Sequence, residues 1–172
     1  AKEVLRQALE YNPGSQDLNF DFAQTSRLID PSIDAERPEF LLSYYQRSFA
    51  KGDRNYRAQL LCARQLTLAG RDSQAKALYD ELKAAAVPFA AKSAVKEEVM
   101  QDKATPRIFN GTVVKRFGTY GFVELDHNGI HCYFDNRSLR DKEDLPSVGD
   151  RVSTTLGFSF FGPSARDLKT IS

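Results

Sequence analysis

Three aromatic side chains near the end of the chain, Tyr120, Phe122 and Tyr133, have the types and spacing of a stacking surface. Tyr120 and Phe122 are two residues apart, so in a β-strand both rings point to the same face. Asn128-Gly129 separates this run from the next alternating run and predicts a hairpin turn, which brings Tyr133 to that face. Stacking a base on a ring contributes about 1–3 kcal/mol, so this pattern predicts contact with single-stranded nucleic acid.

Basic residues close to these rings are candidates for phosphate contacts. The formal net charge of the whole chain is only +1, so overall charge does not indicate nucleic-acid binding. Any electrostatic contribution must come from local groups such as Lys115 with Arg116, or Arg137 with Arg140. A solvated rim with no ligand explains these pairs equally well.

A series of short motifs occurs in a fixed order between residues 107 and 172. The motifs are Gly111, Val113 and Arg116; Gly118-Thr-Tyr-Gly-Phe-Val123; Cys132-Tyr-Phe-Asp-Asn136; Gly149; and Gly162-Pro-Ser-Ala165 followed by Leu168. In this order they resemble the cold shock domain, a five-stranded barrel of the oligonucleotide-binding type. The resemblance implies an antiparallel barrel with Tyr120, Phe122 and Tyr133 outside and with Val123, Cys132 and Phe134 inside.

This chain also departs from the family pattern. Asp135 stands where the family has a histidine, Asn136 replaces an aromatic residue, and Lys115 aligns with the family's first-strand tryptophan. A carboxylate beside a phosphate backbone is repulsive, so the resemblance implies weaker binding or a different ligand. The predicted nucleic-acid-binding residues are Lys115, Arg116, Phe117, Tyr120, Phe122, Tyr133, Asp135, Arg140, Phe160 and Phe161.

Two alternatives remain open for the aromatic residues. Tyr120, Phe122 and Tyr133 could instead face the barrel core or pack against the rest of the chain. Phe158, Phe160 and Phe161 fall near the connection between the last two strands, where such barrels commonly contact ligand. A protein interface explains those three phenylalanines equally well.

Residues 1–104 read as a helical segment with a repeating pattern of small and bulky residues. The positions are Ala1, Leu5, Ala8, Pro13, Leu18, Phe22 and Ala23, and later Gly70, Ala75, Tyr79, Leu82 and Pro88. This spacing resembles the tetratricopeptide repeat of about 34 residues, although a plain array of helical hairpins also fits. We expect an irregular connection at 29–37, a terminal helix at 91–103, and the barrel at 105–172. Because the pattern begins in the middle of a repeat, we expect an excised fragment.

The composition favours a globular protein without catalytic or metal chemistry. The chain has 41% hydrophobic and 27% charged residues, and its two cysteines, Cys62 and Cys132, fit buried thiols of a reducing compartment. His127 and His131 flank the Asn-Gly turn without a third ligand, so they predict turn residues and no metal site. Glu97-Glu98 fits an exposed helix face better than an acid–base pair. No signal peptide or membrane-length apolar run occurs, so we expect a cytoplasmic protein with no membrane partner and no cofactor.

These observations predict a multi-domain protein in which a helical repeat segment precedes a small β-barrel. The expected function is a non-catalytic module whose barrel binds single-stranded nucleic acid, RNA more than DNA, while the helices dock a protein partner. The alternative is a protein–protein interaction module whose barrel has lost nucleic-acid binding. An enzyme to which this chain contributes only a sensory part is a third possibility.

Overall fold

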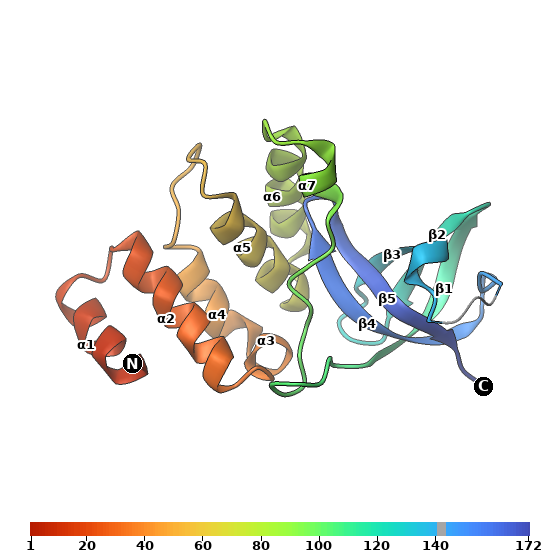
Figure 1. Cartoon of the computed structure of the whole chain (residues 1–172), viewed down its shortest axis with the longest axis horizontal. Helices are drawn as coiled ribbons and strands as arrows, with labels where there is room; N and C mark the ends of the chain where they lie inside the picture. Colours follow the sequence, from red (N-terminus) through yellow and green to blue (C-terminus); the bar gives the residue numbers. More distant parts are fainter. Residues whose placement is uncertain (141–143) are drawn as a thin grey trace.

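The computed structural model describes residues 1–140 and 144–172, and in these residues seven helices precede a closed barrel of five strands (Figure 1). The helices are α1 (Lys2–Tyr11), α2 (Gln16–Ile29), α3 (Ile33–Glu36), α4 (Pro38–Tyr45), α5 (Tyr56–Leu68), α6 (Asp72–Ala84) and α7 (Phe89–Ser93). The strands are β1 (Phe109–Phe117), β2 (Tyr120–Leu125), β3 (His131–Asp135), β4 (Arg151–Ser159) and β5 (Gly162–Thr170). A short 3₁₀ turn, η1 (Asn136–Ser138), follows β3.

The helix starts follow from local sequence signals. The Ser15 hydroxyl accepts a hydrogen bond from the Leu18 amide and caps α2, and the Asn55 side chain caps α5 in the same way. Proline at the first position of α4 loses no helical hydrogen bond there. Helix α5 is buried continuously from residue 58 to residue 68, because it lies between the other helices and the barrel. It is therefore the central element of the molecule.

The barrel has the strand order β1-β2-β3-β5-β4 and is closed. Four neighbouring pairs are antiparallel, but β3 and β5 are parallel, with Tyr133 opposite Ser164. The prediction of an entirely antiparallel barrel was therefore wrong. A closed ring with an odd number of strands cannot alternate direction at every pair, so one pair must be parallel.

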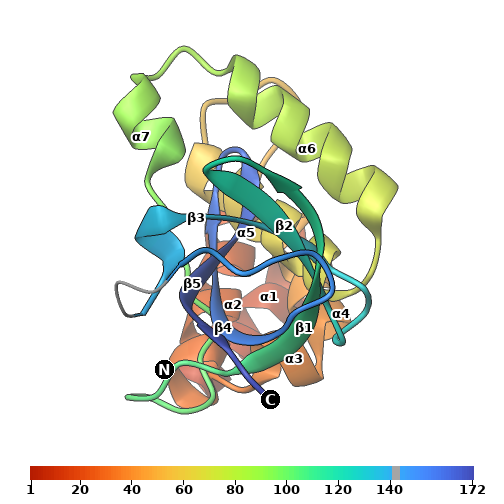
Figure 2. The ribbon, with the colours of Figure 1, turned by 90° about the vertical axis from the view of Figure 1, so that its right-hand side faces the viewer.

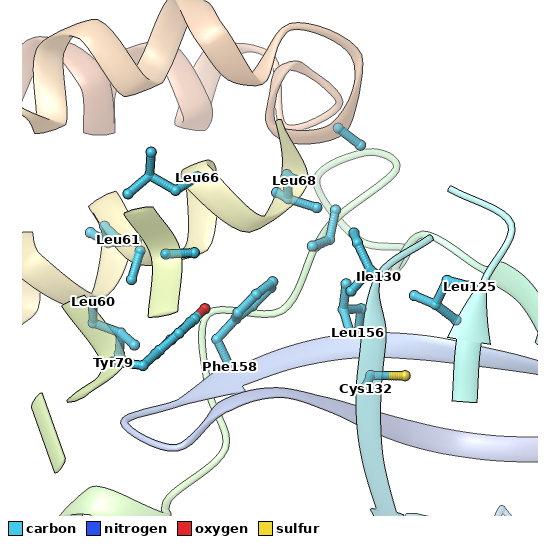
Figure 3. Close-up of a cluster of buried hydrophobic side chains, with 14 of the residues drawn as sticks. Leu60, Leu61, Leu66, Leu68, Tyr79, Leu125, Ile130, Cys132, Leu156 and Phe158 are labelled. Atoms are coloured by element: carbon cyan, nitrogen blue, oxygen red, sulfur yellow. The ribbon is translucent and has the colours of Figure 1, made fainter. Parts of the chain in front are cut away.

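A single hydrophobic core extends through both the helices and the barrel. Figure 3 shows leucines of α5 and Tyr79 of α6 beside Leu156 and Phe158 of β4 and beside Ile130, the residue just before β3. Phe158 is completely buried and points from the barrel toward α5. Burying a phenylalanine contributes about 1.5–3 kcal/mol, so this shared core stabilises the contact between the two parts.

The segment that connects the helices to the barrel is extended, and the predicted helix at 91–103 was wrong. Helix α7 ends at Ser93, after which the chain runs beside β4. Lys96 and Phe158 exchange two backbone hydrogen bonds of 2.9 and 2.7 Å, and the Val99 amide donates to the Leu156 carbonyl. Tertiary strand pairing therefore overrides the helical spacing of valines and alanines in this segment.

Arg64 of α5 fixes this connecting segment to the helices. Its fully buried guanidinium donates to the Glu97 carbonyl at 2.8 Å and to the Asp34 carboxylate at 2.6 Å, and it lies 5.5 Å from the ring centre of Phe158. Arg27 pairs with both Asp34 and the side chain of Glu97. Glu97 is thus part of a half-buried ion network, and the exposed helix face predicted for Glu97-Glu98 was wrong.

Asp34 remains ionised inside this network. Burial by itself would raise the pKa of the Asp34 carboxyl, but Arg64 and Arg27 outweigh burial and hold the pKa below its ordinary value. Asp34 belongs to α3, which forms within the predicted irregular connection at 29–37. The irregular connection therefore supplies the counter-ion of a buried arginine.

Candidate nucleic-acid interface

A β-bulge in β1 determines which side chains reach the outer face of the sheet. The pairing of β1 with β2 shifts between Val113 and Lys115, so one extra residue is accommodated there. Val113 points into the core, whereas Lys115 lies opposite Phe122 and Phe117 lies opposite Tyr120. The bulge thus places Lys115 and Phe117 on the same face as the rings of β2, and the sequence alone gave no signal for it.

Four rings form a continuous group on this face, and we call Phe117, Tyr120, Phe122 and Tyr133 the ring cluster. Phe117 and Tyr120 stack at 5.3 Å and 26°, and Tyr120 and Tyr133 stack at 5.8 Å and 27°. Phe122 meets Tyr133 edge-on at 6.0 Å. Phe117 is 51% exposed and Tyr120 is 38% exposed, while Phe122 and Tyr133 are half-buried. The expected outward, partly exposed position of the rings is confirmed.

The inner side of the same strands explains why the rings point outward. Val123, Cys132 and Phe134 are buried in the barrel, as predicted. Gly121 lies between the two rings of β2 and faces inward. A Cβ atom at Gly121 would come within 2.6 Å of the Phe134 ring and 2.5 Å of the Lys115 carbonyl oxygen. Glycine is therefore required for the Phe134 ring to fill the space beneath the cluster.

The predicted Asn128-Gly129 turn is present and also contacts the helices. Both residues have positive φ, 55° and 63°, as the tight hairpin turn requires. The Ile130 amide donates to the His127 carbonyl, which closes the turn. The Asn128 side chain donates to the Leu68 carbonyl at the end of α5, at 2.7 Å. This turn therefore sets the hairpin register and also anchors the hairpin to the helices.

The basic residues predicted to contact phosphates differ in whether they already bond to other parts of the chain. Lys115 is exposed on the outer face beside the ring cluster. The Arg116 guanidinium donates to the carbonyls of Leu145 and Pro146, so it also ties down a neighbouring loop. Arg140 is exposed, but its backbone pairs with Leu168 near the far end of β5. Lys115 is therefore the member of this group that lies closest to the rings in register.

Asp135 has a structural role that the sequence interpretation missed. Its carboxylate accepts a hydrogen bond from the Arg137 amide and pairs with the Arg137 guanidinium at 2.6 Å, while its own amide donates to the Ser138 hydroxyl. Burial would raise the pKa of Asp135, but the bonds from Arg137 outweigh it and lower the pKa. The Asp-x-x-Ser spacing is a capping signal that could have been read from the sequence.

Asp135 also holds two side-chain groups beside the ring cluster, the Tyr133 hydroxyl and the Arg137 guanidinium. The Tyr133 hydroxyl donates to the Asp135 carboxylate at 3.2 Å, and partial burial together with this carboxylate raises the pKa of Tyr133. The Arg137 side chain is largely exposed, so it places a guanidinium at the β3 edge of the ring cluster. Lys115 and Arg137 thus lie on opposite sides of the rings, on β1 and just after β3.

The phenylalanines at the end of β4 do not belong to this face. Phe160 is buried and packs 6.1 Å from Tyr56 of α5, so in this structure it is not accessible for stacking. Phe161 is 47% exposed and packs 5.7 Å from the exposed ring of Phe89 in α7. The placement of Phe160 on a ligand surface was therefore wrong, and Phe158 and Phe160 are instead buried within the chain itself.

The other end of the outer face is polar. His131 bonds to the Glu124 carboxylate at 2.8 Å, and Arg151 pairs with Asp126 at 2.7 Å. His127 instead packs against the ring of Phe109, and its pKa is lowered by burial and by nearby Arg107. Within residues 1–140 and 144–172, no group of three or more histidine, cysteine or acidic side chains could hold a metal ion.

A scan against protein-family models and a search of curated proteins both give no match to this chain. Among the helices that the structure describes, none is long and apolar enough to cross a membrane.

Proposed function

We propose that this chain is a non-catalytic module whose barrel binds single-stranded nucleic acid, RNA more than DNA, through the ring cluster. The observation that carries the proposal is the nearly parallel stack of Phe117, Tyr120 and Tyr133, which is open to solvent at Phe117. An exposed aromatic stack offers a surface on which a base can continue the stacking. A closed five-stranded barrel is also consistent with the cold shock-like, oligonucleotide-binding type of fold.

The charges around the cluster support a weak and sequence-tolerant interaction. Lys115 and Arg137 flank the rings and could each contact a phosphate, while Asp135 already neutralises part of the Arg137 charge. Stacking depends little on base identity, because every base has a π face. We therefore propose binding that is salt-sensitive, of modest affinity and with little sequence preference.

The helices are proposed to dock a protein partner, in the manner of a tetratricopeptide-like array. Consecutive helices pack on one another from α1 to α6 and leave apolar side chains of α1 exposed, including Val4 and Tyr11. Exposed apolar side chains on one helix are suited to contact with another chain.

A second candidate function is a protein–protein interaction module whose barrel no longer binds nucleic acid. The observation that favours it is the engagement of Asp135 with Arg137, which leaves a carboxylate beside the rings and removes a free guanidinium charge. The near-neutral charge of the whole chain points in the same direction.

Fluorescence anisotropy with labelled oligo-U and oligo-dT, at two salt concentrations, distinguishes the two functions. The proposal predicts measurable binding at low salt, tighter for oligo-U, that weakens as salt rises. Lys115→Ala should weaken all sequences alike and reduce the salt dependence by about one released ion. Lys51→Ala, an exposed lysine in the α4–α5 connection, is the matched control. Absence of binding to either oligonucleotide at low salt would favour the interaction module.

A further inference from the structure

A hollow of about 340 Å³ lies between α6 and the start of β3 and β5. Figure 2 shows α6 running alongside the barrel, with α7 on the barrel's other side. His131 lines this hollow and is two residues before Tyr133 on the same face of β3. The hollow is therefore continuous with the face that carries the ring cluster.

The far side of the hollow ends at a second exposed aromatic surface. Phe161 lines the hollow and packs on the ring of Phe89, and both rings are exposed. Gly129 also lines the hollow, and the space beside it is open, since nothing lies within 4 Å of a Cβ built there. The volume is at the lower end of the range of about 300–1,000 Å³ that small-molecule sites occupy.

The rim of the hollow carries two exposed lysines of α6, Lys76 and Lys83. Their ammonium groups lie 2.7 and 2.6 Å from the carboxylate of Asp80, so the two lysines share one acidic partner. The Lys76 side chain is 75% exposed, and that of Lys83 is 40% exposed. Asp72, the acidic residue of the lining, lies in the first turn of α6, where the helix dipole favours it.

We infer that a single strand bound at the ring cluster continues past His131 into this hollow, where Lys76 and Lys83 of α6 contact its phosphates. This inference rests on the proposed function and assigns part of the binding surface to the helices. The strand would pass from stacking on the barrel rings to the Phe89–Phe161 pair. A strand long enough to reach both surfaces should therefore bind more tightly than a short one.

The test compares a short oligo-U of about four nucleotides with a longer one of about ten, within the range of site sizes known for such barrels. The double variant Lys76→Ala/Lys83→Ala should weaken the longer strand by about tenfold at low salt and lower its salt slope by about two. Binding of the short strand should be unchanged, because the ring cluster alone holds it. Lys51→Ala/Lys103→Ala removes the same charge from residues outside the hollow and should leave both strands unaffected.

The outcomes separate this inference from the proposed function. If Tyr120→Ala weakens both strands and the α6 double variant weakens only the long one, both are supported. If the double variant binds the long strand as tightly as the wild type does, the path over α6 is wrong, but binding at the ring cluster is not contradicted. If no strand of either length binds the wild type, the proposed function and this inference both fail.

Discussion

The barrel carries two groups of aromatic residues, one on the outer face of β1–β3 and one at the end of β4. In the ring cluster the side chains stack on one another and remain open to solvent at Phe117 and Tyr120. At the end of β4, Phe158 and Phe160 are covered by α5 and the connecting segment. Aromatic side chains on one barrel are thus buried or open to solvent according to whether the helices cover them.

This comparison also explains why the helices and the barrel should not be regarded as independent units. The residues that would form one rim of an isolated barrel are part of the shared core, and Arg64 ties the connecting segment over them. Substitutions in the covered group should change stability, whereas substitutions in the ring cluster should change binding. The predictions below test this division, beginning with the largest effect.

Arg64→Ala should produce the largest loss of stability, about 3–5 kcal/mol. The substitution removes the guanidinium that satisfies Asp34 and the Glu97 carbonyl, so buried polar groups lose their partners. Arg54→Ala, at an exposed arginine before α5, is the matched control and should change stability by less than about 0.5 kcal/mol. Urea denaturation measures both, and an equal small effect of the two variants would show that the buried network does not hold the two parts together.

Acid should destabilise the protein through Asp34. The pKa of its carboxyl is lower in the folded state than in the unfolded state, so its contribution is present above the unfolded pKa and is lost as pH falls through the folded pKa. The melting temperature should therefore fall between about pH 5 and pH 2, and Asp34→Asn should remove part of this pH dependence while lowering stability at neutral pH. Thermal unfolding across this pH range is the measurement. An unchanged pH profile in Asp34→Asn would mean that other carboxylates dominate.

Asp135 should have a smaller effect that separates its capping role from its charge. Asp135→Ala removes the cap of η1 and should cost about 1 kcal/mol of stability. Asp135→Asn keeps a side chain that caps well, so it should cost less, and by removing the carboxylate it should tighten binding of oligo-U at low salt. Chemical denaturation and anisotropy on the same samples measure both effects. Weaker binding by Asp135→Asn would mean that the carboxylate does not oppose the ligand.

Local signals predicted those features that depend on neighbouring residues. The alternation around Gly121 and the Asn128-Gly129 turn predicted the outward rings and the inward Cys132 and Phe134, because strand period and turn geometry are local properties. Proline at the first position of α4 is a local signal of the same kind. Local signals of this kind predicted the helices, the barrel and the ring surface, whereas the repeat type and the barrel family remain proposals.

Features that depend on contacts between distant segments were not predictable in the same way. The segment after Ser93 has the spacing of a helix, but the backbone groups of β4 pair with it as a strand. Phe160 lies in a phenylalanine-rich segment that suggests a ligand-binding loop, but α5 covers its ring. The bulge that turns Lys115 and Phe117 outward depends on the register with β2. In each case the partner lies far away in sequence, so propensity and period could not reveal it.

The most direct test of the division between the two aromatic groups measures stability and affinity for oligo-U in the same pair of variants, Tyr120→Ala and Phe158→Ala. Tyr120→Ala should weaken binding by about 1–3 kcal/mol and change the melting temperature little, because its ring is exposed. Phe158→Ala should lower stability by about 3–5 kcal/mol, while the folded protein keeps the affinity of the wild type. If Tyr120→Ala binds as tightly as the wild type, or if Phe158→Ala is the variant that loses affinity while remaining folded, the assignment of the ring cluster as the binding surface is contradicted.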